Sequence, residues 1–505
     1  MYDEMMKKLL EKEGAVFPSL TYKKMVIEPA YDSAKQNFVD YMMQINIAHL
    51  VMLNEQGLVT DEEVKQIGKA IFEIDREFYK GSAYAAEFED LFFRIEGDLI
   101  QRAGDVAGNV HIARSRNDMG IAIYRMALRK KMLSLMEQLT EFHHALNLFA
   151  RENVDTIMIG YTHTQQAQPT TLAHYVKALM DKVERDFDRL KHAYETVNRS
   201  SMGAAALTTS GFAINRERMK ELLGFDGIIE NSWDSVAGAD YLMEAATAVQ
   251  LCALNLGRSM QDFLQWATLE FDAFKLANPY VQISSIMPQK RNPVSLEHTR
   301  ALCSSVVGDT NTVLTMIHNT PFGDIVDTED DLQPYLWKAI DQMNGIYELL
   351  TGALLTMKVN KEKLEQRARE SFANVTELAD TLVRVENISF RQAHTIVSEA
   401  VRKVAADGKE KLSDLTYVLL KEVGKSVIGR DLHLTEKQFV EALDPRHFVE
   451  IRTIMGGPSP ETMKASLSTS AERMDGTKQW LELKKSKLTK VESTLQQYED
   501  RWSEA

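Results

Sequence analysis

The hydrophobic positions along most of the chain recur every three or four residues, which predicts helices and disfavours strands. The longest clear run covers residues 172–197 without a glycine or proline, and its apolar positions are Leu172, Val176, Leu179, Val183, Phe187, Leu190, Tyr194 and Val197. Similar long runs follow Asp240 and Pro293. Helices of this length commonly pack in bundles, often across subunits, so we expect an all-α fold and an oligomer.

The lengths of these runs divide the chain into regions. Residues 1–115 carry short helical segments, residues 116–370 carry the long runs, and residues 371–475 return to short ones. We therefore expect an N-terminal helical domain, a central helix-bundle domain and a C-terminal helical domain. Residues 476–505 read as a helical extension, which either projects like a coiled coil or lies on its own subunit.

Composition and charge narrow the classes of function. The 505 residues are 44% hydrophobic and 26% charged, as in an ordinary globular protein. The net charge of −14 argues against nucleic acid as a partner, because phosphate binding needs a cationic surface. Only Cys252 and Cys303 are present, without a CxxC pair, so we expect neither a disulfide framework nor a cysteine zinc site. A cytoplasmic protein without a signal peptide or membrane span is expected.

One segment concentrates reactive side chains. Residues 281–297, VQISSIMPQKRNPVSLE, stand directly before a long apolar run. Backbone amides at a helix start and the charge of Lys290 favour an anion there. In that field Ser284 could act as a base that removes a proton α to a carboxylate. On these residues alone, a helix-capping connector is the alternative.

A second segment is suited to binding carboxylates. Residues 109–120, NVHIARSRNDMG, bring Ser115, Arg116 and Asn117 together. Arginine can bind a carboxylate through two parallel hydrogen bonds, and serine and asparagine donors can fix its orientation. The alternative is a charged loop that caps the next helix.

A third segment, residues 160–175, reads GYTHTQQAQPTTLAHY and precedes a long helix. Thr162 and Gln168 can bind an anion or an amide, and His163 can relay a proton near neutral pH. A lone histidine can equally be structural.

Together the three segments resemble the fumarase and aspartase superfamily, and within it argininosuccinate lyase. SSIMPQKRNP is similar to the superfamily's signature loop, ARSRND to the first region of argininosuccinate lyases, and GYTH with QAQP to the second. The three matches stand in the order of the family, and the resemblance extends over residues 85–465.

This resemblance implies a fold and a reaction. The fold would be an all-α homotetramer with a central twenty-helix core, in which each active site is assembled from three chains. The reaction would be a reversible anti elimination that releases fumarate and an amine from an N-succinyl-type substrate. No metal or organic cofactor is required. For an argininosuccinate lyase the amine is arginine, and the step belongs to arginine biosynthesis.

The resemblance also implies residue roles. Ser284 would take the Cβ proton, and Lys290 with the loop amides would stabilise the resulting aci-carboxylate. His163 would assist protonation of the leaving nitrogen or orient its carboxylate partner. Arg116 would add charge or shape the pocket. The remaining substrate-binding residues would be Ser115, Asn117, Thr162, Gln168 and Asn292.

The chain departs from the family in residues 320–334, TPFGDIVDTEDDLQP. Argininosuccinate lyases carry there a tyrosine, a glutamine and a lysine that help to bind the arginine half of the substrate. This chain offers Asp324, Glu329 and Leu332, so an amino-acid carboxylate would meet acidic groups. Two enzyme hypotheses remain, an argininosuccinate lyase or a relative that acts on another amine, for example a diamine-disuccinate lyase. A third is a non-enzymatic structural protein, as some lens crystallins of the family are.

Two smaller departures concern the signature loop and the C-terminus. Ile283 replaces the glycine that usually precedes the serine pair. We expect this change to make the loop less permissive in its backbone conformation. The last 30 residues extend beyond the usual end of the family.

Overall fold

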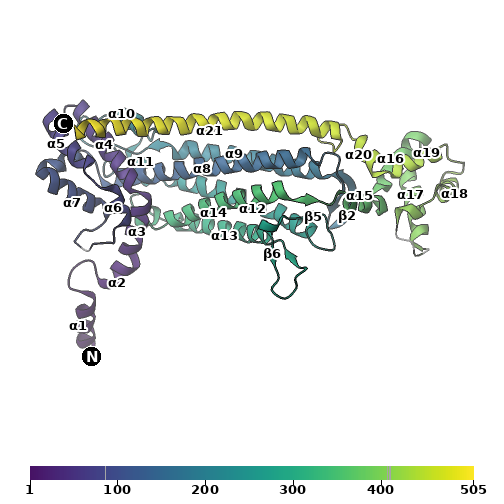
Figure 1. Ribbon diagram of the computed structural model, residues 1–505, viewed down its shortest axis with the longest axis horizontal. Coiled ribbons are helices and arrows are strands. Elements are labelled where there is room, and N and C mark those ends of the chain that lie inside the picture. The colour runs from purple at the N-terminus through teal and green to yellow at the C-terminus, as the bar shows by residue number, and fades with distance from the viewer. Residues whose placement is uncertain (86, 407, 409–410, 505) are drawn as a thin grey trace.

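The structure is a computed structural model that describes residues 1–85, 87–406, 408 and 411–504. The molecule is elongated, with long helices along its length and groups of shorter helices at its two ends (Figure 1). Helices dominate and the strands are short, which confirms the all-α fold class. Among the described residues, no helix is both long and apolar enough to cross a membrane.

Within the described part of the chain, five long helices form the central bundle: α8 (Arg116–Arg151), α9 (Leu172–Val197), α12 (Asp240–Trp266), α13 (Val294–Ile317) and α14 (Gln333–Thr356). Each helix contacts the next and α14 contacts α8, so the five form a closed ring around a shared core. All the apolar positions predicted along α9 are buried. Their spacing places them on one face of the helix, as the sequence pattern predicted.

The helices before the bundle are α1 (Tyr2–Glu13), α2 (Leu20–Tyr22), α3 (Glu28–Asn37), α4 (Val39–Glu55), α5 (Asp61–Phe72), α6 (Arg76–Gly81) and α7 (Leu91–Ala103). Thr60 caps α5, because its hydroxyl accepts the amide of Glu63 while the Glu63 carboxylate accepts the Thr60 amide at 2.8 Å. Side chains of these helices and of the bundle share one hydrophobic core. The core is continuous across residue 115, and a separate N-terminal domain stays a prediction.

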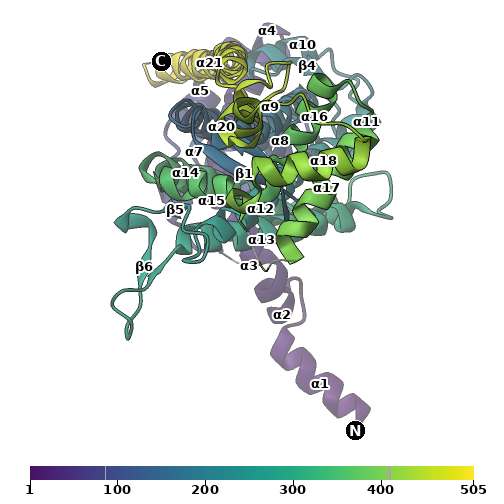
Figure 2. The same cartoon turned by 90° about the vertical axis from the view of Figure 1, so that its right-hand side faces the viewer.

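Short elements connect the bundle helices. Strands β1 (Ile157–Thr162) and β2 (Gln165–Thr171) form an antiparallel hairpin, as do β6 (Gln282–Ile283) and β7 (Arg291–Asn292). The other pairs are β3 (Arg199–Ser200) with β4 (Gly227–Ile228) and β5 (Phe274–Lys275) with β8 (Lys358–Val359). Helices α10 (Arg216–Leu222) and α11 (Ser232–Ala237) lie between α9 and α12 in the chain. The loop between β6 and β7 protrudes from the body (Figures 1 and 2).

A second group of short helices lies at the far end of the bundle: α15 (Lys361–Glu370), α16 (Val375–Glu386), α17 (Phe390–Ala406), α18 (Tyr417–Ile428), α19 (Glu436–Leu443) and α20 (Pro445–Glu450). Most of them surround a hydrophobic core of their own, which includes Leu378, Ile396 and Leu420. A separate core is what an independent helical domain requires.

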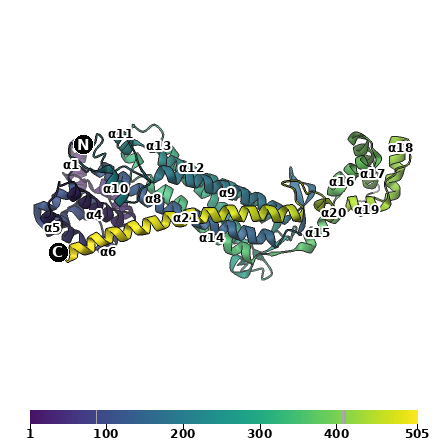
Figure 3. The same ribbon diagram turned by 90° about the horizontal axis from the view of Figure 1, so that it is seen from above.

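The last helix, α21 (Pro460–Ser503), has 44 residues and lies along the bundle (Figures 1 and 3). It contacts α8 and α9 at one end and α4 and α5 at the other. Of the two alternatives for the C-terminal extension, the structure therefore has the helix that lies on its own subunit. Because α21 passes through residue 475 without a break, the predicted start of an extension there does not coincide with the start of a helix.

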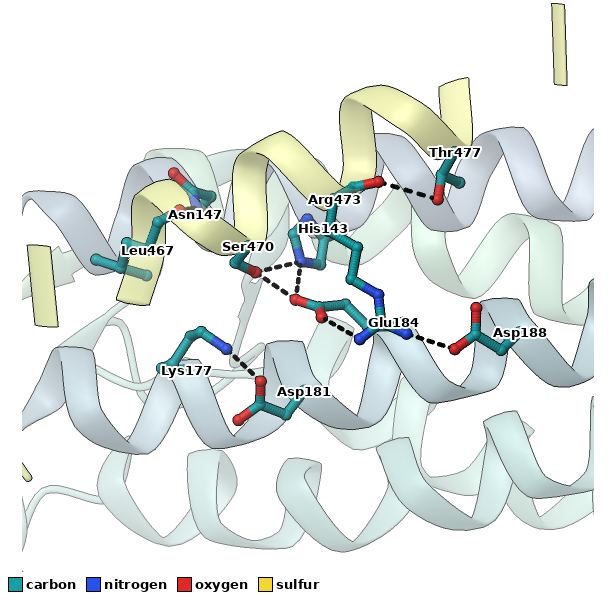
Figure 4. A network of polar contacts seen from close by, with 10 residues as sticks. All are labelled: His143, Asn147, Lys177, Asp181, Glu184, Asp188, Leu467, Ser470, Arg473 and Thr477. Atoms are coloured by element: carbon teal, nitrogen blue, oxygen red, sulfur yellow. Dashed lines mark hydrogen bonds and ion pairs between the residues drawn. The ribbon is translucent and has the colours of Figure 1, made fainter. Parts of the chain in front are cut away.

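Buried polar contacts hold α21 in place (Figure 4). His143 Nε2, from α8, lies 3.2 Å from both Glu184 Oε1 in α9 and Ser470 Oγ in α21. Ser470 also donates to Glu184, and Arg473 donates to the other carboxylate oxygen at 3.2 Å. Near the C-terminus, Arg76 donates to Glu499 Oε2 at 2.7 Å. Since breaking a buried pair leaves a charge without compensation, these contacts fix α21 against the body.

Candidate active site

The first predicted segment lies at the N-terminal end of α8. Ser115 is the N-cap, and its hydroxyl donates to Asn117 Oδ1 at 2.8 Å. The Asn117 side-chain amide donates to Asp324 Oδ2 at 2.6 Å. The fold therefore brings the predicted carboxylate-binding segment against residues 320–334, although the two are far apart in the chain.

Arg116 turns away from these groups. Its guanidinium lies 2.8 Å from Asp90 Oδ2 and 3.3 Å from Glu89 Oε1, and it stacks over the ring of Phe93. Because its charge is already paired within the chain, this geometry favours the role of shaping the pocket over that of binding substrate charge. Arg114 next to it is buried, which lowers the pKa of its guanidinium to about 10.

A loop that the sequence reasoning missed lies beside this segment. Asp118 is fully buried, and its Oδ2 accepts the backbone N–H groups of Gly203 at 2.9 Å and Ala205 at 3.0 Å. Burial raises the pKa of Asp118 to about 6. Ala113 and Ala205 have φ angles of 58° and 53°, a left-handed conformation that costs free energy in residues other than glycine. The signal that could have found this loop is the run of small residues in MGAAAL.

Residues 320–334 gather carboxyl groups at the same place. Burial and, next, the neighbouring Asp324 raise the pKa of Glu329. Asp330 accepts a hydrogen bond from the Tyr124 hydroxyl at 2.8 Å. Leu332 is fully buried in the core and offers no polar contact. The segment thus presents acidic groups where the sequence resemblance implies side chains that bind the amino-acid half of a substrate.

Two buried polar side chains adjoin these carboxyl groups. Gln333 and Tyr241 are both fully buried. Gln333 and Tyr241 interact with each other, yet within the described residues neither the amide atoms of Gln333 nor the hydroxyl of Tyr241 makes a hydrogen bond of normal geometry. Burying a polar atom without a hydrogen-bond partner costs free energy. The polar atoms of these two side chains can therefore form further hydrogen bonds.

The segment with Thr162 and His163 forms the β1–β2 hairpin. His163 and Thr164 occupy the tip, with φ angles of 51° and 63°. Two consecutive left-handed residues suit a tight hairpin turn, yet such turns favour Asn and Gly, and a β-branched threonine is unusual there. Thr162, His163 and Gln168 are all exposed. The hairpin therefore presents its polar groups outward at the expense of a strained turn.

The signature segment is a protruding loop between β6 and β7. Ser284 Oγ accepts the backbone N–H of Met287 at 3.1 Å and that of Ile286 at 3.4 Å. These amides belong to the loop itself and not to the start of a helix. The helix predicted after Pro293 is confirmed, since α13 begins at Val294. Amide groups that point at Oγ would stabilise an alkoxide.

The rest of the loop is open. Lys290 is exposed, and Asn292 pairs with Gln282 in the short β6–β7 ladder. Ile283 pairs with Arg291 and is 69% exposed. A paired strand residue needs no left-handed backbone, so this position accommodates isoleucine in place of the family's glycine.

The three predicted groups lie at three separate places in one subunit. The N-terminal end of α8 and the β1–β2 hairpin lie at opposite ends of the bundle, and the β6–β7 loop protrudes from its side (Figure 1). Within the described residues, no three His, Cys, Asp or Glu side chains are grouped as metal ligands would be. A single chain therefore supplies the parts of the predicted site without assembling them.

Comparisons with protein families agree with this architecture. The family described as Lyase matches residues 31–308, and the family described as Argininosuccinate lyase C-terminal matches residues 372–450. Argininosuccinate lyase 2 of Agrobacterium fabrum is 40% identical over 460 residues, covering 91% of each chain. Argininosuccinate lyase of Methanocaldococcus jannaschii is 36% identical, covering 90% of this chain and 92% of the relative.

Solved structures of related enzymes have a similar fold. EDDS lyase in complex with formate superposes with a TM-score of 0.86 at 31% identity, covering 97% of both chains. The class II fumarase of Schistosoma mansoni has a TM-score of 0.67 at 17% identity, covering 89% of this chain and 94% of the fumarase. The second likeness concerns the fold alone.

Proposed function

The chain belongs to the argininosuccinate lyase family, and we propose that it releases fumarate from argininosuccinate to leave arginine. The observation that carries the proposal is the match to argininosuccinate lyases at 34–40% identity over 90–92% of the chain. The protein is a carbon–nitrogen lyase, and the reaction contributes to arginine biosynthesis.

In the proposed reaction, Ser284 Oγ removes the proton from Cβ of the succinyl group. The electron pair of the C–H bond moves into the adjacent carboxylate, and the resulting aci-carboxylate is stabilised by Lys290 and the loop amides. The pair then forms the C=C bond of fumarate while the C–N bond breaks. The leaving nitrogen takes up a proton with the assistance of His163. The hydrogen bonds from the amides of Ile286 and Met287 to Ser284 Oγ support its role as the base.

The carboxylates of the succinyl group would be held by neutral donors from all three segments. Asn117 and Ser115 already form one hydrogen-bonded pair, so their orientation is set before substrate binds. The further donors would be Thr162, Gln168 and Asn292, with Arg116 shaping the pocket from its pairing with Asp90.

The active site would be completed in a homotetramer, with each site shared by three chains. This part of the proposal is supported by the separate placement of the three segments in one subunit (Figure 1). Light scattering after size exclusion should give a mass of four chains. Mixing and refolding Ser284→Ala with Asn117→Ala should restore about a quarter of wild-type activity, since each segment comes from an intact chain about half the time. No recovery in mixed tetramers would mean that one chain supplies both residues.

A cytoplasmic location, with neither nucleic acid nor membrane as a partner, completes the proposal. It is supported by Cys252 and Cys303, which are free and buried, because a reducing compartment keeps thiols unpaired.

A second candidate function is the release of fumarate from another amine. It is favoured by Asp324, which is in contact with Asn117, and by the acidic environment of Glu329. A carboxylate on the amine would be repelled here, whereas a second ammonium group would be attracted.

One assay separates these functions. The purified protein is incubated with fumarate and either arginine or ethylenediamine, and loss of fumarate absorbance is followed. Consumption with arginine alone supports the first function, and consumption with ethylenediamine alone supports the second. No consumption with arginine, ethylenediamine or any other amine tested, and no cleavage of argininosuccinate, would contradict both and favour a structural protein.

A further inference from the structure

The β1–β2 hairpin is joined to a distant loop through a single imidazole. His174 lies in the first turn of α9, and its Nδ1 is 2.8 Å from Thr170 Oγ1 in β2. Its Nε2 is 3.0 Å from the carbonyl oxygen of Gly456, in the loop between α20 and α21. The ring therefore bridges the strand that leads away from His163 and a loop from nearly 300 residues further along the chain.

The hydrogen-bond chemistry sets the orientation of this ring. A carbonyl oxygen can only accept, so His174 Nε2 carries a hydrogen and donates to Gly456. In the neutral ring Nδ1 then accepts from the Thr170 hydroxyl. Both ring nitrogens are satisfied, and neither is free for proton transfer.

The loop that receives this bond is itself anchored. Arg452 donates to Glu377 in α16 at 3.0 Å, and the Thr462 hydroxyl donates to the carbonyl of Thr453 at 3.1 Å. Gly456 has a φ of 84°, a conformation that glycine adopts without strain. The Gly456 carbonyl that faces His174 thus belongs to a backbone segment with few alternative conformations.

A second contact fastens the other side of the hairpin. The Ser371 hydroxyl donates to Gln166 Oε1 at 2.7 Å. Ile157 and Ile159 of β1 pack in a small cluster with Ala368, Ala373 and Val449. The hairpin is therefore supported from the side of the C-terminal helices as well as from α9.

This support matters because the tip is strained. The left-handed conformations of His163 and Thr164 persist only if the surrounding structure holds them. We propose that His174 is a positioning residue, which ties the base of the hairpin to Gly456 and so fixes where Thr162 and His163 are presented. The catalytic part of this inference rests on the proposed function, whereas the structural part does not.

The test compares two substitutions of the same ring. The amide of His174→Gln reaches far enough to donate to the Gly456 carbonyl, whereas the shorter side chain of His174→Asn can meet only Thr170. Amide hydrogen exchange in residues 160–168 should rise about tenfold or more in His174→Asn and stay near wild type in His174→Gln. His192→Asn, at an exposed position of α9, is the matched control and should change nothing.

Turnover adds a functional readout. In His174→Asn, kcat should fall about 10- to 100-fold with a smaller change in KM, because a displacement near 1 Å costs about that much. His174→Gln should recover most of the loss. If His174→Asn does not fold, His174→Ala, which also loses the hydrogen bond to the Gly456 carbonyl, replaces it and should give the same rise in exchange.

The outcomes are distinct. Hydrogen exchange and kcat of His174→Asn equal to wild type, or equal losses in the Gln and Asn variants, would overturn the proposal. If wild type turns over no substrate, the proposed function fails, and the exchange data still decide whether His174 positions the hairpin.

Discussion

The start of α8 and the β6–β7 loop are both predicted to act on the same substrate, yet the chain holds them differently. At the start of α8, Ser115, Asn117 and Asp118 have hydrogen-bond partners in other residues, and Asp118 joins a distant loop. In the β6–β7 loop, Ser284 contacts amides of its own loop, and Ile286 is 83% exposed. On the proposed function, the predicted binding groups would be preorganised within the subunit, whereas the predicted base, Ser284, would be presented to a site completed by other chains.

The largest effect should come from the open loop and concern activity alone. Ser284→Ala removes the proposed base, so kcat should fall on the order of 10²- to 10⁴-fold. The melting temperature should not change, because Ser284 takes no part in the core. Ser285→Ala is the matched control in a purified-enzyme assay and should retain activity. Turnover near wild type in Ser284→Ala would remove Ser284 from the mechanism.

At the start of α8 a substitution should instead affect stability. Asp118→Ala leaves the amides of Gly203 and Ala205 without an acceptor in a buried place. The free energy of unfolding should fall by about 3 kcal/mol, as measured by chemical denaturation. Asp3→Ala, at an exposed position of α1, should leave it unchanged. An unchanged midpoint in Asp118→Ala would show that this end of α8 is no more fixed than the loop.

The carboxyl groups beside Asn117 should make this end sensitive to pH. Because the pKa of Glu329 is raised in the folded state, the protonated form is favoured, and stability falls as pH rises through the folded pKa. Glu329→Gln cannot ionise, so its melting temperature relative to wild type should increase from about pH 5 to about pH 9. Glu11→Gln, in α1, is the control. A difference in melting temperature between Glu329→Gln and wild type that stays constant across this pH range would contradict the raised pKa of Glu329.

The smallest effect should come from Ile283. Since its side chain is exposed and its backbone needs no left-handed conformation, Ile283→Gly should cost at most about 1 kcal/mol. Turnover should stay within about threefold of wild type in the same assay. A loss greater than tenfold would mean that isoleucine has a specific part in how the loop meets its substrate.

Local patterns made much of this architecture predictable. The apolar positions from Leu172 to Val197 fall on one buried face, and Thr60 caps its helix as the residue types require. The match of three segments also identified a family that the relatives confirm. The roles of Ser284, His163 and the binding residues stay predictions.

The long-range contacts could not be predicted from the sequence. The motif ARSRND does not predict that Asn117 donates a hydrogen bond to Asp324, or that Asp118 accepts one from the amide of Gly203. These partners are separated by 85 residues or more. The same holds for His174 and Gly456. Sequence reasoning placed the segment of Ser284 before the helix that follows Pro293, as α13 confirms, but it did not predict the β6–β7 hairpin that holds the segment.

The sequence by itself determined which segments are helices and where their apolar faces lie, and it predicted which residues are candidates for chemistry, because periodicity, capping and residue type are local properties. Only the tertiary structure decided that α21 lies on its own bundle, that Arg116 is paired with Asp90, and that three chemical segments stand apart in one subunit. Such placements follow from the packing of distant surfaces, which no single stretch of residues contains.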